Sequence, residues 1–206
     1  VLFRSIWKFL ATVMNAGDEV LYPNPGYPIY ESQINYQGGV ALPYKYNQTK
    51  SGFDIDLDYL AKSISSKTKI LILNNYQNPM SASSSKEELK ALSKLVLKHD
   101  LWVLSDDAYY EIRYSQDSPN SILNFPGMKQ RTVILYTFSK KYAMTGWRVG
   151  ASIGPESLIK HMARFNINDE SCTNHFIQHA LASVLNESNR SEEHTSELQS
   201  PMYLVC

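Results

Sequence analysis

The amino-acid sequence predicts an α/β fold in which helices flank a mostly parallel β-sheet. Short runs of β-branched or aromatic residues alternate with helical patterns along most of the chain. Several of these runs are almost entirely apolar, which is typical of strands that are buried on both faces. No internal repeat or low-complexity linker interrupts the alternation. The order of the elements therefore favours parallel strands that are joined by crossover helices.

Each predicted strand is a short apolar run bounded by polar or turn-forming residues. The runs cover residues 19–22, 39–43, 69–74, 101–106, 132–138 and 148–153. Ligands of such sheets bind outside the carboxyl ends of the strands, so the residues that follow each run are the first place to look for a functional site.

Three helices are predicted from hydrophobic periodicity. The clearest covers residues 86–99, where a capping box at 85–88 precedes an apolar stripe made of Leu89, Leu92, Leu95 and Val96. A second helix runs to about residue 166 and has Pro155 in its first turn, where the missing N–H costs nothing. The third has a core-facing stripe of Phe176, Ile177, Ala180, Leu181, Val184 and Leu185.

The charge balance argues against two classes of partner. The 206 residues include 20 basic and 20 acidic side chains, which gives a formal net charge of zero without charged blocks. Surfaces that bind nucleic acid or anionic membranes carry clustered positive charge, so we expect neither partner. The longest apolar runs are far shorter than the roughly 18 residues that span a bilayer.

Cysteine usage indicates a reducing compartment, and a cytoplasmic location fits best. Cys172 and Cys206 are the two cysteines, which excludes a disulfide framework and a four-thiolate metal site. The sequence contains no His-Glu-x-x-His zinc motif, and no metal site is predicted.

The two ends of the sequence differ from its middle. The chain opens on Val1 rather than on Met, and from about Arg190 it loses the amphipathic pattern of the preceding residues. We expect a fragment in which residues 1–5 and 190–206 are non-native additions similar to translated adaptor sequence, and residues 6–189 form the domain. A natural polar tail is the alternative for the C-terminal end.

Four motifs follow the predicted strands, whereas the Gly-x-Gly dinucleotide motif and the phosphate-binding Gly-Lys-Ser/Thr motif are absent. The four are Asn74-Asn75-Tyr76-Gln77-Asn78-Pro79, Ser105-Asp106-Asp107-Ala108-Tyr109, Thr137-Phe138-Ser139-Lys140 and Gly146-Trp147-Arg148-Val149-Gly150. Together with Gly17-Asp18-Glu19-Val20 and Pro23-Asn24-Pro25-Gly26-Tyr27-Pro28, they resemble the signatures of the class I and II aminotransferases, which are pyridoxal 5'-phosphate (PLP) enzymes of fold type I. The resemblance covers nearly all of residues 6–189. It implies the large, cofactor-binding domain of such an enzyme, truncated at both ends.

The resemblance assigns catalytic roles to Lys140, Asp106 and Tyr109, and a cofactor contact to Asn78. Lys140, which beside Lys141 could otherwise be an ordinary solvated lysine, matches the family lysine that binds the cofactor aldehyde covalently and later moves the substrate α-proton. Asp106 matches the carboxylate that keeps the pyridine nitrogen protonated, so that the ring withdraws electrons. Tyr109 and Asn78 match the residues that hydrogen-bond the phenolic oxygen of the cofactor.

Four further residues match other contacts of the cofactor. Arg148 matches the guanidinium that clamps the phosphate, and Thr137 and Ser139 offer hydroxyl donors to the same group. Tyr27 occupies the position of an aromatic ring that stacks on the pyridine face. From the residues alone, Tyr27 and Ser139 fit a core or surface role equally well.

The chain also departs from the family pattern. Tyr76, Met80 and Ser81 replace the family's Pro, Thr and Gly, Asp107 stands at a Glu position, and Lys141 stands where a small or hydroxyl residue is commoner. From the resemblance, we expect that the chain begins inside the helix that follows the phosphate-binding Gly-Ser/Thr turn, and that it lacks the family's N-terminal arm and C-terminal small domain. We therefore expect the 206-residue chain alone to bind PLP feebly and to be nearly inactive.

For the complete protein, the resemblance implies a homodimeric aminotransferase that exchanges an amino group between an amino acid and a 2-oxo acid. Two alternatives stay open. PLP-dependent lyases of the same fold use the same lysine, aspartate and arginine. An aminotransferase-like domain fused to a DNA-binding module would sense a ligand without turning it over.

Overall fold

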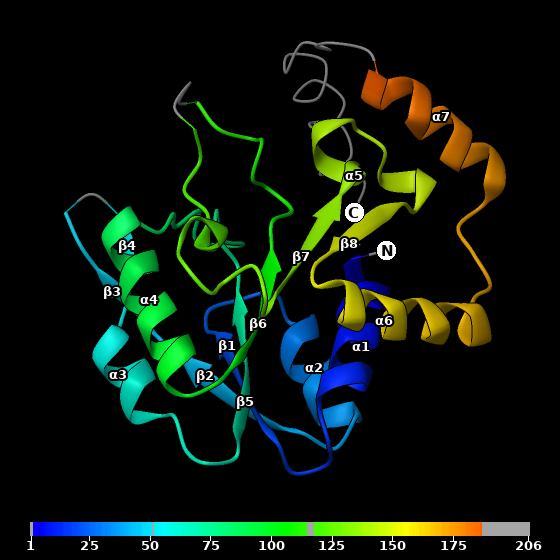
Figure 1. The fold of residues 1–206 in the computed structure, drawn as a ribbon. Coiled ribbons are helices and arrows are strands. Elements are labelled where there is room, and N and C mark those ends of the chain that lie inside the picture. The colour runs from blue at the N-terminus through cyan, green and yellow to red at the C-terminus, as the bar shows by residue number, and fades with distance from the viewer. Residues whose placement is uncertain (1, 51, 115–117, 187–206) are drawn as a thin grey trace.

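The computed structural model describes residues 2–50, 52–114 and 118–186. These residues form a central six-stranded sheet with the strand order β2-β1-β5-β6-β7-β8 (Figure 1). The strands are β1 (Glu19–Pro23), β2 (Val40–Tyr44), β5 (Thr68–Leu73), β6 (Trp102–Asp106), β7 (Thr132–Thr137) and β8 (Gly150–Ile153). Neighbouring strands from β2 to β7 are parallel, and β8 runs antiparallel to β7. The prediction of a mostly parallel sheet is confirmed.

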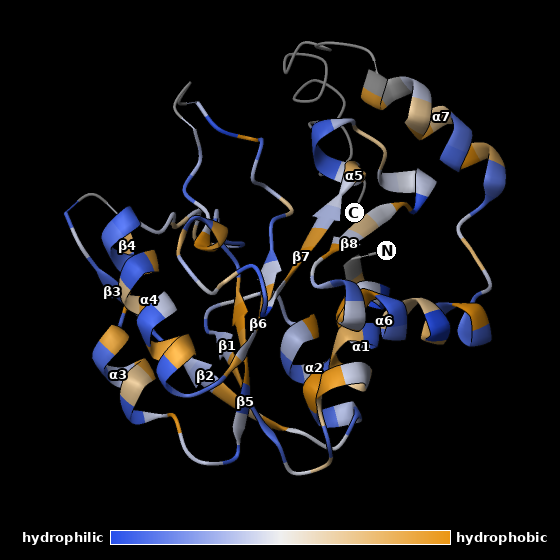
Figure 2. Ribbon diagram, in the orientation of Figure 1, coloured by the Kyte–Doolittle hydropathy of each residue, from blue (hydrophilic) through white to orange (hydrophobic). Residues whose placement is uncertain are grey.

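Both faces of the sheet are covered, as the continuous apolar strands predicted. Helices α1 (Leu2–Val13), α2 (Ile29–Tyr36) and α6 (Glu156–Asp169) lie on one face, and α3 (Leu57–Lys62) and α4 (Lys86–Lys98) lie on the other (Figure 1). Alternate residues of β5 supply the two cores: Ile70 and Ile72 pack on the first side, and Leu71 and Leu73 on the second. Figure 2 shows the apolar residues gathered in the strands at the centre of the molecule.

Helix α4 begins at the predicted capping box. The Ser85 hydroxyl accepts the N–H of Glu88 at 3.1 Å, and the Glu88 carboxylate accepts the N–H of Ser85 at 3.0 Å. The second carboxylate oxygen of Glu88 accepts the N–H of Ile55 at 2.7 Å. Ile55 ends a hairpin formed by β3 (Tyr46–Gln48) and β4 (Phe53–Ile55), so the same side chain starts the helix and holds the hairpin against it.

The later strand and helix boundaries differ from the predicted ones by a few residues. Strand β7 ends at Thr137 because Phe138 opens the short helix α5 (Phe138–Lys141). Strand β8 begins at Gly150 rather than at Arg148, since Arg148 has left-handed backbone (φ 54°) after the 3₁₀ turn η2 (Thr145–Trp147). Pro155 caps α6 from outside instead of lying in its first turn.

Helix α7 (His175–Asn186) buries a narrower stripe than predicted. Ile177 and Leu181, one helical turn apart, pack on Phe138, Met144 and Val149. Phe176 and Leu185 are 65% and 58% exposed, so the prediction of a core role was wrong for these two. Phe176 lies about 100° round the helix from Ile177, so the contact line through Ile177 and Leu181 does not cover it. Leu185 continues that line by one turn, but it lies at the end of α7, beyond the last packed residue.

The sequence patterns did not predict α2, α3, the β3–β4 hairpin or the short 3₁₀ helix η1 (Ile122–Asn124). Residues 2–5 belong to helix α1. The predicted non-native segment 190–206 lies outside the described residues. Within the part of the chain that the structure describes, no helix is long and apolar enough to cross a membrane.

Candidate active site

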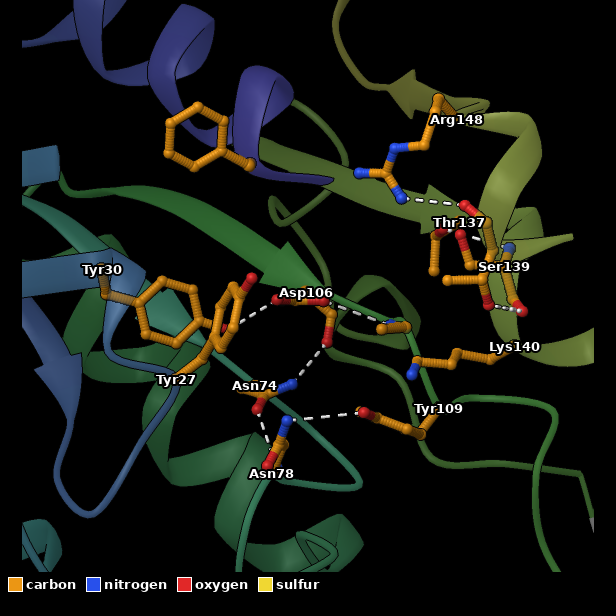
Figure 3. Close-up of a pocket in the computed structure, with 13 residues that line it drawn as sticks. Tyr27, Tyr30, Asn74, Asn78, Asp106, Tyr109, Thr137, Ser139, Lys140 and Arg148 are labelled. Atoms are coloured by element: carbon orange, nitrogen blue, oxygen red, sulfur yellow. Dashed lines mark hydrogen bonds between the residues drawn. The ribbon is translucent and has the colours of Figure 1, made fainter. Parts of the chain in front are cut away.

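The eight predicted site residues meet at one cavity of about 200 Å³ at the carboxyl ends of β5, β6 and β7 (Figure 3). They come from separate loops and turns, and their parallel strands bring them to the same edge of the sheet. The cavity is lined by Tyr27, Asn78, Asp106, Tyr109, Thr137, Ser139, Lys140 and Arg148, and also by Phe3, Tyr30, Asn74, Ala108 and Thr145.

Asp106 ends β6 and places a carboxylate at the floor of the cavity. The residue is 2% exposed, and burial raises the pKa of its carboxyl to about 6. The hydroxyl of Tyr30 donates to Oδ2 at 2.5 Å and the N–H of Ala108 donates to Oδ1 at 3.2 Å, and both bonds lower the pKa again. A cationic group in the cavity would stabilise the ionised carboxylate further.

Tyr30 was not predicted, although it lies three residues after Tyr27. Its ring is fully buried in α2, and it meets the half-buried ring of Tyr27 edge to face with 5.7 Å between the centroids. Gly26 permits the approach of this loop, because a Cβ at that position would lie 2.1 Å from the carbonyl oxygen of Pro23. The spacing of the two tyrosines, at i and i+3, is the signal that could have indicated Tyr30.

Asn74, also missed, connects the ends of β5 and β6. Its amide donates to the carbonyl oxygen of Asp106 at 3.0 Å, and its Oδ1 accepts the N–H of Asn78 at 3.0 Å. The Asn78 amide in turn donates to the Tyr109 hydroxyl at 3.4 Å. These contacts fix the Asn78 amide and the Tyr109 phenol on the same side of the cavity as Asp106 (Figure 3).

Lys140 enters the cavity from the short helix α5. Its Nζ lies 5.3 Å from the centroid of the Tyr109 ring. The Thr137 hydroxyl accepts the N–H of Ser139 at 3.2 Å and so caps α5 at its first turn. Because α5 continues directly from β7, the lysine is held close to the end of a rigid strand.

Arg148 lies at the mouth of the cavity with an exposed side chain. Its guanidinium donates to the carbonyl oxygen of Thr145 at 2.9 Å, and the Thr145 hydroxyl donates to the carbonyl oxygen of Ser139 at 3.3 Å. This chain of contacts orients Arg148 toward the hydroxyls of Thr137 and Ser139 (Figure 3).

The cavity therefore offers three kinds of chemistry at separate places. A buried carboxylate suits a protonated ring nitrogen, an amine beside a phenol suits an aldehyde, and a guanidinium with hydroxyls suits a phosphate. No group of three or more His, Cys, Asp or Glu in the described ranges is arranged to hold a metal ion.

Comparison with known proteins gives the same family as the motifs. The chain is 35% identical to an aromatic-amino-acid aminotransferase of Thermococcus litoralis over 95% of its own length, and to an aspartate aminotransferase of Pyrococcus abyssi over 86%. It spans about half the length of these relatives, 50% and 46%.

Solved structures agree with the sequence relatives. An aromatic aminotransferase of Pyrococcus horikoshii superimposes with a TM-score of 0.88 at 32% identity, covering 96% of this chain and 52% of that one. An aspartate aminotransferase of Rhizobium meliloti has the same TM-score at 30% identity, with 95% and 49% covered. The sequence profile of aminotransferase class I and II matches residues 3–201. The chain thus belongs to the class I and II aminotransferase family.

Proposed function

We propose that the complete protein containing this chain is a PLP-dependent aminotransferase that exchanges an amino group between an amino acid and a 2-oxo acid. The observation that carries the proposal is the meeting of Lys140, Asp106 and Tyr109 in one cavity with Arg148 at its mouth. Relatives and structural neighbours that are named aminotransferases support the same activity. A homodimer and a cytoplasmic location are parts of this proposal.

The residues of the cavity fit PLP. The two hydrogen-bond donors to the Asp106 carboxylate in the described part of the chain, the Tyr30 hydroxyl and the Ala108 N–H, are both neutral. A buried carboxylate with neutral partners gains most from a cation, and a protonated pyridine nitrogen supplies one. When bound, PLP supplies an electron-withdrawing ring that stabilises negative charge at the substrate α-carbon.

The side chains then take separate roles. Asp106 holds the proton on the ring nitrogen, and Tyr27 packs against the ring. Arg148, with the hydroxyls of Thr137 and Ser139, binds the phosphate. Asn78 and Tyr109 hydrogen-bond the phenolic oxygen.

Lys140 is assigned both the covalent step and the proton transfer. Its Nζ would hold the cofactor through the aldehyde carbon, with loss of water. Once the amino group of the substrate has replaced it there, the freed neutral amine would take the proton from the substrate α-carbon and return it to the former aldehyde carbon.

Borohydride reduction tests the assignment of the lysine. The complete protein, loaded with PLP and reduced, should carry the cofactor on Lys140, and peptide mapping distinguishes this residue from Lys141. Lys140→Ala is the matched control and should carry no label there. Cofactor on Lys141 would contradict the assignment.

A transamination assay tests the proposed activity. Transfer of the amino group from an amino acid should require a 2-oxo acid as acceptor, which distinguishes transamination from lyase chemistry. A protein that retains the label on Lys140 but turns over no amino acid with any 2-oxo acid would contradict the proposed activity.

A further inference from the structure

A second polar cluster lies next to the site residues along the chain. We call it the Glu111 bridge; it consists of Glu111, Tyr136 and Lys141. The Lys141 ammonium donates to Glu111 Oε1 at 2.7 Å, and the Tyr136 hydroxyl donates to Glu111 Oε2 at 2.5 Å. None of the three residues lines the cavity. The bridge is therefore available for a role that the proposed chemistry does not use.

Each member of the bridge adjoins a residue of the cavity. Glu111 follows Tyr109 by two positions, Lys141 follows Lys140, and Tyr136 precedes Thr137. The Glu111 carboxylate thus connects the turn after β6, on which it lies, to the helix α5 and the strand β7.

The turn that carries Tyr109 has little regular structure of its own. The N–H of Tyr110 donates to the carbonyl oxygen of Asp107 at 3.2 Å, and that of Ile112 donates to Tyr109 at 3.0 Å. These bonds are local and do not set the distance from the turn to α5. The bridge does connect the two, and Tyr136 adds an anchor on β7, a strand that is paired on both sides.

The groups of the bridge keep the protonation states that hydrogen bonding requires. Burial, and then the hydrogen bond to Glu111, raise the pKa of the Tyr136 phenol, which therefore stays protonated at neutral pH. Burial lowers the pKa of Lys141, but the Glu111 carboxylate and the Tyr142 side chain raise it by more, so the ammonium stays charged. The Lys141 Nζ also lies 5.4 Å from the centroid of the Tyr142 ring. Tyr110 is a further neighbour, and its pKa is raised by burial and in part by Glu111.

We propose that Glu111 is a positioning residue that sets the separation between the Lys140 amine and the Tyr109 phenol, an inference that rests on the proposed function of those two groups. The side chains of Glu111 and Lys141 are 32% and 39% exposed, so their ion pair alone contributes little to stability. The ion pair matters instead for the position of the two groups, because a displacement of about 1 Å between reacting groups costs on the order of a hundredfold in rate.

The test is a pH titration of the absorption band of Lys140-bound PLP in the complete protein. The double variant Glu111→Ala/Lys141→Ala removes one negative and one positive charge and so leaves the net charge unchanged. We expect the midpoint of its titration to rise by about one pH unit, because a displaced Tyr109 no longer stabilises the charged phenolic oxygen. Tyr136→Phe keeps the ion pair and should raise the midpoint by a smaller amount.

The matched control is another ion pair with the same charges. Glu156 and Lys160 are 2.6 Å apart on α6, with 82% and 71% of their side chains exposed, and neither lines the cavity. Glu156→Ala/Lys160→Ala should titrate like the wild-type protein.

Two results separate this inference from the proposed function. Bridge variants that fold, as judged by thermal unfolding, and titrate like the control overturn the role of Glu111. If the double variant does not fold, Tyr136→Phe decides in the same way. A wild-type protein that carries no reduced cofactor on Lys140 overturns the proposed function itself.

Discussion

Removing the Tyr30 hydroxyl should destabilise the chain in a pH-dependent way. Tyr30 and Asp106 are 0% and 2% exposed, and the hydroxyl donates to the Asp106 carboxylate at 2.5 Å. Tyr30→Phe deletes this donor and keeps the ring. The hydrogen bond favours the ionised carboxylate, so its loss raises the pKa of Asp106 above the value of about 6 in the native protein.

The sign and size of the pH dependence of stability follow from proton linkage. Asp106 has a higher pKa in the folded chain, about 6, than its ordinary value of 3.8, so the folded state binds more protons between these values and its stability falls as pH rises. In the wild type this loss amounts to about 3 kcal/mol and is complete above about pH 6. A hydrogen bond to a charged group contributes about 1.5–3 kcal/mol and one to a neutral group about 1 kcal/mol. The difference of about 0.5–2 kcal/mol corresponds to a further rise in the pKa of Asp106 of about 0.4–1.5 pH units in the variant.

Urea unfolding of the 206-residue chain without cofactor, followed by circular dichroism at pH 5 and pH 8, measures this difference. Tyr30→Phe should lose about 1 kcal/mol at pH 5, where Asp106 is protonated, and about 0.5–2 kcal/mol more at pH 8, where it is ionised. Tyr44→Phe is the matched control, because Tyr44 is equally buried and its hydroxyl donates to the carbonyl oxygen of Ile72 at 3.0 Å. That variant should lose the same amount at both pH values.

The comparison also removes the contribution of the neighbouring carboxyl. Burial raises the pKa of Asp107 to about 6, but Asp107 is present in all three proteins and its effect cancels in the differences. Equal losses for Tyr30→Phe at pH 5 and pH 8 would refute the reasoning, since they would mean that the hydroxyl does not distinguish the two charge states of Asp106.

Three further substitutions probe other parts of the structure. Arg148→Ala should weaken PLP binding to the complete protein by about 10-fold to 100-fold in a spectroscopic titration, because a charged hydrogen bond to the phosphate is lost; unchanged affinity would remove Arg148 from the phosphate site. Asp106→Ala should abolish turnover while borohydride still fixes PLP on Lys140, and loss of the label would contradict separate roles for the two residues. Ser85→Ala should lower the free energy of unfolding by about 1 kcal/mol through loss of the helix cap, with PLP affinity unchanged, and an unaltered urea midpoint would argue against the cap.

The elements that the sequence predicted best are those whose signal is local. Residues 70–73 are apolar without interruption because the strand that contains them is buried on both faces. Helix α4 carries its own start signal at Ser85 and Glu88. In contrast, α3 is only six residues long, and β3 includes exposed Asn47 and Gln48, whose strand pairing depends on a partner elsewhere in the chain. Such elements are stabilised by tertiary contacts rather than by a periodic pattern.

The residues of the candidate site also divide into those with a local sequence signal and those that depend on contacts with distant residues. The predicted residues follow strands or belong to known motifs, and parallel strands bring their ends to one edge of the sheet. Tyr30 was missed because its role depends on a hydrogen bond to a residue 76 positions away. Asn74 stands at the start of a motif, but its contact to the carbonyl oxygen of Asp106 joins two neighbouring strands and leaves no local signature.

The two ends of the cavity differ in burial, and this difference predicts how strongly each end would bind PLP. Asp106 and Tyr30 form a buried, hydrogen-bonded floor, where a protonated ring nitrogen would interact strongly with the carboxylate because water is excluded. Arg148 at the mouth is exposed, so its attraction for a phosphate is screened by water and salt. We therefore expect the Asp106 end to contribute more of the affinity for PLP than the Arg148 end. The phosphate end of the cavity gains strength only if additional donors, such as the N–H groups of a helix start, exclude water from it.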